Sequence, residues 1–388
     1  MKFGVSLSCQ NRESDWVRYE RGDFSASPPI ADWKILEQNL HLADLVEPLG
    51  FDSLFSVEHH FSPHHMTPNG VQWLTYMAAR TERIGFGTGL IVLPWHHPVR
   101  AAEELLMLDN LLKGRELYIG MGRGAALSEF KGLGIDLAES RDRFDQGVDV
   151  FRSTLTERHF NYQNSFFRGE GVTPRPEPFT PDLADRLYAG CTTESSITAS
   201  ANLGLRPMFV GAVGWEMMEK QQKLFNDIRA SKGLDRSRAI VTQYTYCAPT
   251  AQEAQEKATK WIGGGFRTAL KHYQHDKVEN FRNVKGYEEY VPRAEIHHTL
   301  DPKQFEGAMV NNCLWGSPEQ MIERIATLAS HVDCEQLVMV VNPGDTPVDE
   351  AERSMRLISE VVLPALRRMD LTKKNVMDLG VAGWPQRS

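Results

Sequence analysis

The residues with the clearest chemical potential form the run Glu58-His59-His60, which directly follows a short apolar stretch at residues 53–57. A histidine can act as a general acid or base because its pKa lies near neutrality. Adjacent side chains on a strand point to opposite faces, so His59 and His60 are not expected to bind one metal ion. We predict catalytic roles for His59 and Glu58 and no metal site. A metal hydrolase and a purely structural role remain alternatives.

A second candidate is the glycine-rich run GMGRG at residues 120–124. Its spacing differs from the GxGxxG signature of dinucleotide-binding proteins. Glycines allow a backbone to approach a flat ligand closely, and Arg123 could pair with a phosphate or a carboxylate. We therefore predict that Gly122 and Arg123 contact a cofactor. The alternative is a tight turn that carries a surface arginine.

A third candidate is the hydroxyl-rich run Thr192-Thr193-Glu194-Ser195-Ser196, which precedes a helix of small residues ending at Gly204. The first turn of a helix leaves backbone N–H groups unpaired, and the helix dipole favours negative charge there. The run could equally be an ordinary helix cap. Because it follows a strand, as Arg123 does, the two features together favour a phosphorylated cofactor.

Short apolar runs that alternate with helical patterns must position these groups. The predicted strands are residues 2–8, 53–57, 84–93, 116–121, 187–191, 207–210, 239–247 and 336–341. The predicted helices are residues 33–49, 71–80, 98–112, 140–155, 215–230, 250–261, 317–330 and 348–368. Eight such units predict an α/β fold of the (β/α)8 TIM-barrel type, with function at the carboxyl ends of the strands. An open doubly wound sheet is the structural rival.

Three stretches interrupt this alternation. Residues 9–29 are charged and turn-rich and predict a long loop, a type of segment that often serves as a lid or binding loop. Residues 156–185 predict an insertion containing a hairpin, and the polar residues 263–310 predict an irregular insertion over the barrel mouth. We expect one barrel domain over residues 1–368 and a polar tail over 369–388.

The composition argues against several classes of partner and location. The net charge of −8 and the isoelectric point near 5.9 argue against nucleic acid or an anionic membrane as the main partner. No run reaches the roughly 18 apolar residues of a membrane span, and we recognise no signal peptide. The five cysteines form no CxxC pair. A reduced cytoplasmic location is therefore expected.

Together these motifs resemble those of the bacterial luciferase-like flavin-dependent monooxygenases. The resemblance is carried by GFDSLFSVEHHF, by GFGTGLIVLPWHHPVR with the following GRELYIGMGRG, and by the TTESS helix start. It covers roughly residues 1–211 well, and LWGSPEQMIERI and EQLVMVVNPG more weakly. It implies a TIM barrel that binds reduced FMN, supplied by a separate NAD(P)H:flavin reductase. In the family, O2 adds to the flavin to give a peroxyflavin that oxygenates a small organic substrate. A homodimer is expected by the same resemblance.

The resemblance also assigns residues. The family's active-site histidine corresponds to His59 and its phosphate-binding arginine to Arg123. Its phosphate-binding segment corresponds to Thr193, Glu194, Ser195 and Ser196. A cis peptide that is characteristic of the family's third strand would fall at Gly89-Leu90, where glycines inside a strand already suggest a close approach by a ligand. Apart from the resemblance, we predict that the substrate wall includes Trp95, His60 and the aromatic residues of 263–310, which are Phe266, Tyr273, Phe281, Tyr287 and Tyr290.

The departures from the family pattern fall where a substrate would bind. The luciferases carry a cysteine at the position of Gly122, and the loop SPHHMTPNG at residues 62–70 is unlike theirs. Residues 263–310 do not align. Light emission from long-chain aldehydes is therefore not expected, and the substrate is left open. A deazaflavin-dependent hydride-transfer enzyme and a non-catalytic flavin-binding protein are the functional alternatives.

Overall fold

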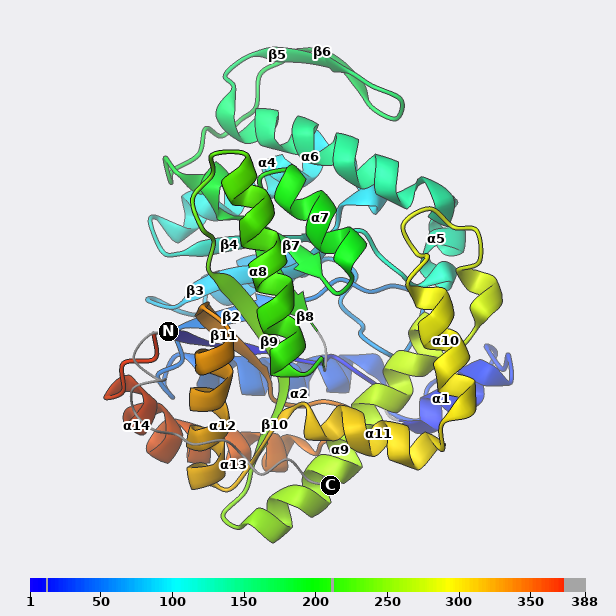
Figure 1. Ribbon diagram of the computed structural model, residues 1–388, viewed down its shortest axis with the longest axis vertical. Coiled ribbons are helices and arrows are strands. Elements are labelled where there is room, and N and C mark those ends of the chain that lie inside the picture. The colour runs from blue at the N-terminus through cyan, green and yellow to red at the C-terminus, as the bar shows by residue number, and fades with distance from the viewer. Residues whose placement is uncertain (12, 211–212, 373–388) are drawn as a thin grey trace.

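Eight parallel strands close into a barrel at the centre of the molecule (Figure 1). The structure is a computed structural model that describes residues 1–11, 13–210 and 213–372. The barrel strands are β1 (Lys2–Ser6), β2 (Ser53–Ser56), β3 (Gly85–Val92), β4 (Leu117–Gly122), β7 (Leu187–Cys191), β8 (Arg206–Val210), β9 (Ala239–Cys247) and β11 (Cys334–Val340). Pairing of β8 with β9, with Met208 opposite Ile240, closes the ring. The barrel prediction is confirmed, and the open sheet is excluded.

Helices surround the barrel, as the alternating sequence pattern predicts. They are α2 (Asp32–Val46), α3 (Gly70–Ala78), α4 (Pro98–Leu112), α5 (Leu127–Leu133), α6 (Ser140–Thr156), α7 (Glu194–Asn202), α8 (Trp215–Ser231), α9 (Ala251–Tyr273), α12 (Pro318–His331), α13 (Val348–Leu357) and α14 (Leu363–Arg367). A π-helical turn at Ile358–Val362 joins the last two. The predicted tail begins in the described part of the chain, but its residues 373–388 lie outside it.

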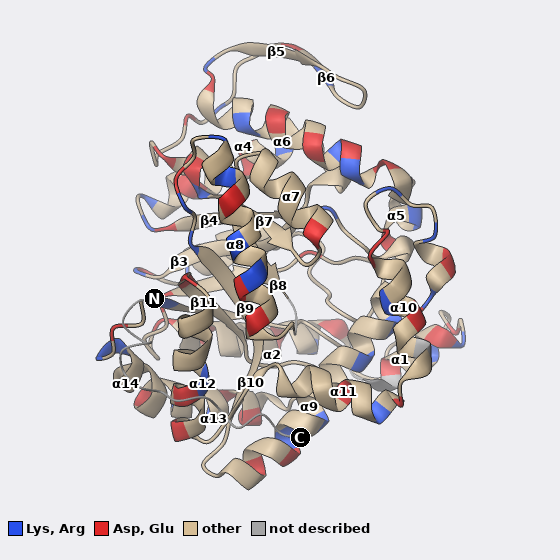
Figure 2. Cartoon of the chain, viewed as in Figure 1, with Lys and Arg blue, Asp and Glu red and all other residues tan. Residues whose placement is uncertain are grey.

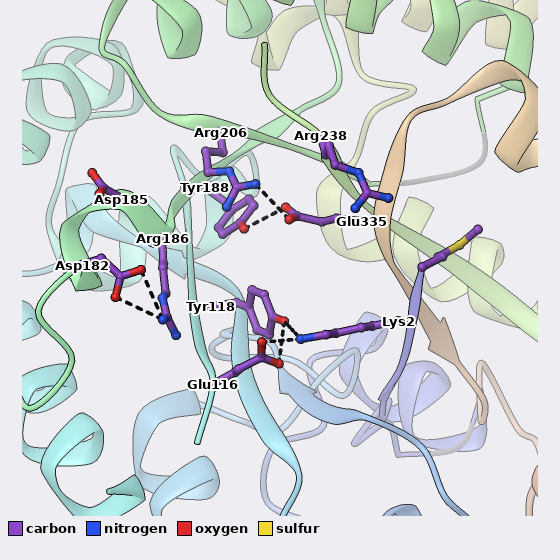
Figure 3. A pocket seen from close by; sticks show the side chains of 11 residues that line it. Lys2, Glu116, Tyr118, Asp182, Asp185, Arg186, Tyr188, Arg206, Arg238 and Glu335 are labelled. Carbon is purple, nitrogen blue, oxygen red and sulfur yellow. Dashed lines mark hydrogen bonds and ion pairs between the residues drawn. The ribbon is translucent and has the colours of Figure 1, made fainter. Parts of the chain in front are cut away.

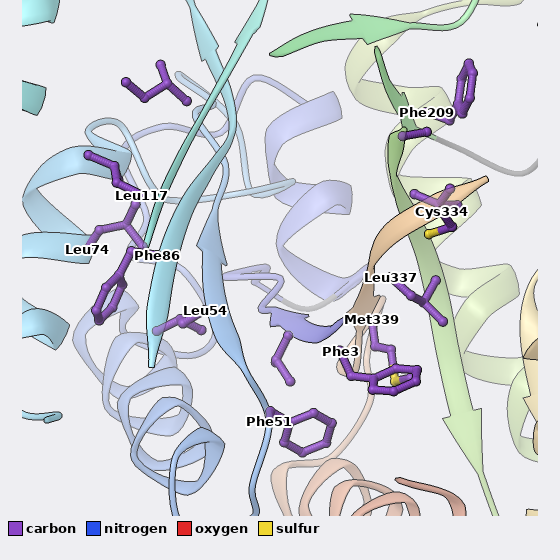
Figure 4. Close-up of a cluster of buried hydrophobic side chains, with 14 of the residues drawn as sticks. Phe3, Phe51, Leu54, Leu74, Phe86, Leu117, Phe209, Cys334, Leu337 and Met339 are labelled. Carbon is purple, nitrogen blue, oxygen red and sulfur yellow. The ribbon is translucent and has the colours of Figure 1, made fainter. Parts of the chain in front are cut away.

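The core has two layers, one on each side of the barrel wall. Inside the barrel, the side chains of Phe55, Tyr118, Tyr188, Met208, Ile240 and Val338 pack together. Between strands and helices lies a larger cluster that includes Phe3, Phe86, Leu117 and Leu337 (Figure 4). Fully burying such a side chain contributes roughly 1.5–3 kcal/mol. This rigid wall fixes where the strand ends, and hence the candidate residues, are placed.

The interrupting stretches are more ordered than the sequence indicates. The predicted loop at 9–29 contains α1 (Glu13–Glu20), and the predicted hairpin is present as β5 (Phe160–Gln163) and β6 (Arg168–Val172). In Figure 1 this hairpin projects beyond α6. The prediction of irregular structure over 263–310 is wrong, because α9 continues to Tyr273 and is followed by α10 (Tyr290–Thr299) and α11 (Pro302–Asn311). The short strand β10 (Leu314–Gly316), which pairs with β9 outside the ring, was not predicted.

The three glycines at residues 263–265 explain why α9 is longer than predicted. An interior glycine costs a helix about 1 kcal/mol relative to alanine. Here the missing side chains let the helix lie against the chain at residues 343–344, where a Cβ on Gly265 would come within 3.1 Å of Pro343 Cβ. Close packing therefore outweighs the weak helix propensity.

The amino-terminal end of the barrel holds a cluster of charged side chains around a cavity of about 430 Å³ (Figure 3). Arg206 pairs with Glu335 at 2.9 Å, and Tyr188 donates a hydrogen bond of 2.8 Å to the same carboxylate. Lys2 pairs with Glu116. In barrel enzymes this end serves stability, so the candidate site is to be sought at the opposite end.

The surface charges and the state of the cysteines match what we expected from the composition. Figure 2 shows basic and acidic residues interspersed along the same outer helices, for example on α6 and α8. Within the described residues, no helix combines the length and the apolar character that crossing a bilayer would demand. All five cysteines are buried and unbridged.

Candidate active site at the barrel mouth

His59 lies just past the carboxyl end of β2 and is held through both ring nitrogens. Its Nδ1 lies 3.1 Å from Glu129 Oε1, and its Nε2 lies 3.0 Å from the hydroxyl of Tyr273. Its side chain is 12% exposed. A carboxylate on one ring nitrogen fixes the tautomer and orientation of an imidazole and leaves the other nitrogen for proton exchange.

Glu129 is the residue that organises this cluster, and it comes from α5. Its Oε1 also accepts a 2.7 Å hydrogen bond from the His60 backbone N–H and lies 3.3 Å from His272 Nε2. Burial opposes ionisation, yet the hydrogen bonds from His272 and His59 lower the pKa of Glu129 to about 2. A buried carboxylate that stays ionised can stabilise positive charge on either histidine.

Glu58, which we predicted to be catalytic, makes its hydrogen bonds with residues other than His59. It accepts hydrogen bonds from the Val92 backbone N–H at 2.8 Å and from His96 Nε2 at 2.6 Å, and His60 Nε2 lies 3.3 Å away. Although burial works in the opposite direction, these hydrogen bonds lower the pKa of Glu58 below its usual value. Glu58 therefore ties the loop after β2 to the end of β3.

The histidines around His59 form a compact, mostly neutral group. His64 and His65 are buried, and burial lowers the pKa of both well below the usual value, with neighbouring histidines adding to the effect. His272 Nδ1 lies 2.8 Å from Ser62 Oγ. His59, Glu129 and His272 are close enough to hold a divalent ion. His59 hydrogen-bonds to Glu129, and His272 Nε2 lies 3.3 Å from the same carboxylate oxygen.

Trp95 and His60, the predicted substrate wall, lie next to each other. Their rings meet edge to face with centroids 5.3 Å apart, and Trp95 also packs edge to face on Phe130 at 5.6 Å. The Trp95 indole Nε1 is buried without a hydrogen-bond partner among the described residues. These two side chains form an aromatic surface beside the His59 cluster.

The bond between Gly89 and Leu90 in β3 is cis, as the resemblance predicts. The Leu90 side chain packs closely over glycines of two other strands, β4 and β7. A Cβ on Gly122 would come within 2.7 Å of Leu90 Cδ1, and one on Gly190 within 2.6 Å. Gly122 thus has a packing role, which is consistent with its replacing the cysteine of the luciferases.

The Thr192–Ser196 run forms the start of α7, with Thr193 as the N-cap. The Ser196 N–H donates to Thr193 Oγ1 at 3.1 Å, and the Thr193 N–H donates to Ser196 Oγ at 3.0 Å. This capping box leaves the N–H groups of Glu194 and Ser195 for another acceptor. The ordinary cap is therefore confirmed, and the anion site at this helix start stays a prediction.

Arg123 lies at the end of β4 beside a second arginine that the sequence analysis missed. Arg141, from α6, is buried, and its Nη2 has no hydrogen-bond partner among the described residues. Burial and the charge of Arg123 lower the pKa of Arg141. Asp145 Oδ1 lies 3.6 Å from Arg141 Nη1. Two neighbouring guanidinium groups with an unsatisfied donor are typical of anion-binding sites, so the anion site stays a prediction here.

Sequence reasoning singled out His59 and Arg123 and named Tyr273 only among the aromatic residues of a substrate wall. It missed Glu129, Arg141 and His272. His59 and Arg123 lie directly after strands, at the end of the barrel where functional residues are expected. Tyr273 and His272 lie in a stretch that we predicted to be irregular. A helical reading of residues 263–273 would have placed them near the barrel mouth.

Comparisons with known proteins identify the family of the chain. The family model described as luciferase-like monooxygenase matches residues 1–333. The alkanal monooxygenase alpha chain of Photorhabdus laumondii subsp. laumondii is 24% identical over 352 residues, which cover 88% of this chain and 95% of that protein.

Two solved structures share the fold. The first, the oxygenating constituent of 3,6-diketocamphane monooxygenase from Pseudomonas putida in complex with FMN, has a TM-score of 0.70 and 18% identity, and the match covers 94% of this chain and 98% of the other. The second, an F420-dependent secondary alcohol dehydrogenase in complex with an F420-acetone adduct, has a TM-score of 0.68 and 15% identity, with 94% and 99% covered. Because the family model matches most of its length, the chain belongs to the luciferase-like monooxygenase family.

Proposed function

We propose that this protein is a monooxygenase that uses reduced FMN and O2 to oxygenate a small organic substrate. The observation that carries the proposal is the pairing of two features at one end of the barrel. One is the Glu129–His59–Tyr273 chain, and the other is the anion site formed by Arg123, Arg141 and the start of α7. Reduced FMN would supply the electrons that reduce O2, and a separate NAD(P)H:flavin reductase would supply reduced FMN.

The anion site would hold the FMN phosphate. Arg123 and Arg141 would neutralise its charge, and the N–H groups of Glu194 and Ser195 would donate to its oxygens, with the hydroxyls of Thr193 and Ser196 holding the turn in place. The Leu90 side chain lies beside Gly122 of β4 and Gly190 of β7, where it would support the flavin ring. In the related diketocamphane enzyme the bound cofactor is FMN, which is consistent with this assignment.

His59 would provide or accept a proton next to the reacting centre. Its Nδ1–H is engaged by the ionised Glu129, so its Nε2 is the atom free to exchange a proton with Tyr273 or with a bound molecule. The surrounding apolar and aromatic side chains, including Trp95, would exclude water from the site. Water exclusion suits oxygenation because it limits the wasteful release of peroxide.

The proposal is tested by measuring flavin binding and turnover in His59→Ala and Arg123→Ala variants. We expect His59→Ala to lower turnover by about a hundredfold or more, in the range of general acid–base contributions, while FMN still binds. Arg123→Ala should weaken FMN binding. Unchanged turnover in His59→Ala would refute the assigned role of that residue.

The rival function is hydride transfer with the deazaflavin coenzyme F420, as in the related alcohol dehydrogenase. The two proposals differ in which coenzyme binds and in whether oxygen is consumed. Titration of the purified protein with FMN and with F420 separates them. Metal analysis of the same preparation tests the His59–Glu129–His272 cluster for a bound ion.

A further inference from the structure

The carboxylate of Glu289 lies at the start of α7, on the two N–H groups that the capping box leaves free. Its Oε1 accepts a 2.9 Å hydrogen bond from Ser195 N–H, and its Oε2 accepts a 3.3 Å hydrogen bond from Glu194 N–H. This is the two-oxygen contact with helix N–H groups that a phosphate typically makes. The chain therefore places one of its own anions in the predicted phosphate site.

The same short segment also covers Arg123. The carbonyl of Gly286 accepts a 2.7 Å hydrogen bond from Arg123 Nη2, and the guanidinium lies 3.8 Å above the ring of Tyr287. Gly286 has a φ of +78°, and a Cβ there would collide with Arg123 Nη1. Glycine thus allows the backbone to approach the arginine this closely.

The end of the segment is fixed to the strand that precedes α7. Arg293 Nη2 donates a 3.1 Å hydrogen bond to the Thr192 carbonyl and lies 3.8 Å from Glu289. Residues 285–293 therefore contact both halves of the anion site, the arginine after β4 and the helix start after β7. Because a single segment contacts both halves, it covers the predicted anion site as a unit.

We propose that residues 285–293 form a gate over the cofactor phosphate site, in which the Glu289 carboxylate holds the place that the FMN phosphate takes. FMN then binds by displacing this carboxylate. This inference rests on the proposed function, because it requires the phosphate to bind between Arg123 and α7. It adds a regulatory element to that site, namely a built-in competitor for the phosphate.

Charge and space both allow the exchange. A phosphate monoester carries about −1.5 to −2 charges near pH 7, whereas a glutamate carboxylate carries one, so the phosphate gains more than Glu289 does from the helix N–H groups and from the nearby arginines. The Glu289 side chain is 37% exposed. It lines an open groove of about 780 Å³ together with Ser195, Thr198 and two other carboxylates, Asp145 and Glu194, so the groove leaves space beside the helix start. A competitor of this kind lowers the affinity for FMN without blocking its entry, which suits a flavin that arrives reduced and leaves oxidised.

The gate is tested by titrating the full-length protein with FMN and with riboflavin, which lacks the phosphate. Glu289→Gln removes the charge and keeps the shape, and Glu295→Gln changes an exposed carboxylate on the same helix, α10. Removing a charge-assisted contact should tighten FMN binding roughly five- to tenfold. Riboflavin binding should stay unchanged, and Glu295→Gln should match the wild type for both ligands. Thermal unfolding of each variant verifies that the fold is intact.

The possible results distinguish failure of the gate from failure of the proposed phosphate site. If Glu289→Gln leaves FMN affinity unchanged or weakens it, while Arg123→Ala weakens FMN binding, the gate is refuted and the phosphate site stands. If riboflavin binding tightens as much as FMN binding, Glu289 does not compete with the phosphate and the gate is again refuted. If the wild type binds FMN and riboflavin equally and Arg123→Ala has no effect, the phosphate site itself is wrong.

Discussion

At the residue scale, Glu129 is the neighbour whose substitution should most affect the proposed acid–base role of His59, because its carboxylate contacts the His59 ring. Glu129→Gln keeps the size of the side chain but removes the charge that stabilises a protonated imidazole. We expect turnover to fall by about tenfold to a hundredfold, the lower part of the range for general acid–base catalysis, with FMN affinity nearly unchanged. Steady-state turnover and FMN titration measure the two quantities.

Glu58 provides the matched comparison, because it is also buried and ionised but contacts His96, His60 and the Val92 N–H instead of His59. Glu58→Gln should lower the free energy of unfolding by about 1–3 kcal/mol, the cost of weakening buried charge-assisted hydrogen bonds. Its turnover, corrected for folded protein, should fall less than that of Glu129→Gln. The opposite order would return the catalytic role to Glu58.

The sequence placed His59 and Arg123 correctly at strand ends, because residues after parallel barrel strands must share one face. It could not pair His59 with Glu129, since seventy residues separate them. The contact depends on where α5 packs, which neither periodicity nor capping signals indicated.

At the scale of elements, two glycines of β4 test how the strands make room for each other. A Cβ on Gly120 would collide with the Thr88 backbone carbonyl, which cannot move without breaking the β3–β4 pairing, whereas one on Gly122 would meet only the flexible Leu90 side chain. Overpacking typically costs 1–3 kcal/mol. We expect Gly120→Ala to lower the free energy of unfolding by about 3 kcal/mol and Gly122→Ala by about 1 kcal/mol.

Urea unfolding of the two variants, compared with the wild type, measures this difference. Equal losses would mean that the Leu90 side chain is as immobile as the backbone. In that case Gly122 could not accept the luciferase cysteine without a change in β3. FMN titration of Gly122→Ala would then report whether the position of Leu90 affects cofactor binding.

Element boundaries were predictable where local signals and packing agree. The strands follow β-branched apolar runs and α12 begins at a Ser317 capping box, so both were found. α9 was cut short because three consecutive glycines are poor helix formers, and only their fit against residues 343–344 explains the continued helix. α10 and α11 have mixed polar sequences, so their positions depend on contacts with the barrel mouth.

At the scale of the whole molecule, the buried histidines predict how stability depends on pH. Burial lowers the pKa of His64 and His65 well below 6.5 in the folded protein, while in the unfolded chain both titrate near about 6.5. Below that pH the unfolded state binds more protons, so the free energy of unfolding decreases as the pH falls. Glu129 adds to the loss at lower pH, because its lowered pKa stabilises the fold above about 4.5 and this contribution disappears as the pH falls toward about 2.

Urea unfolding at a series of pH values between about 5 and 7.5 measures this slope. Each histidine held neutral contributes up to about 1.4 kcal/mol per pH unit. Replacing His64 and His65 together with glutamine should flatten the slope, while His159→Gln, on the exposed hairpin, should leave it unchanged. An identical slope in the double variant would show that other groups control the acid sensitivity.

The central claim, oxygenation with reduced FMN, is tested most directly by the reaction of the loaded protein with oxygen. The protein would be loaded with reduced FMN without oxygen and then mixed with oxygenated buffer, while oxygen consumption and the appearance of oxidised FMN are recorded together. The proposed function predicts that oxygen is consumed well before oxidised FMN appears, with slow release of peroxide. Simultaneous oxygen loss and flavin oxidation, at the rate of free reduced FMN, would contradict the claim, and tight F420 binding in the same preparation would point to hydride transfer instead.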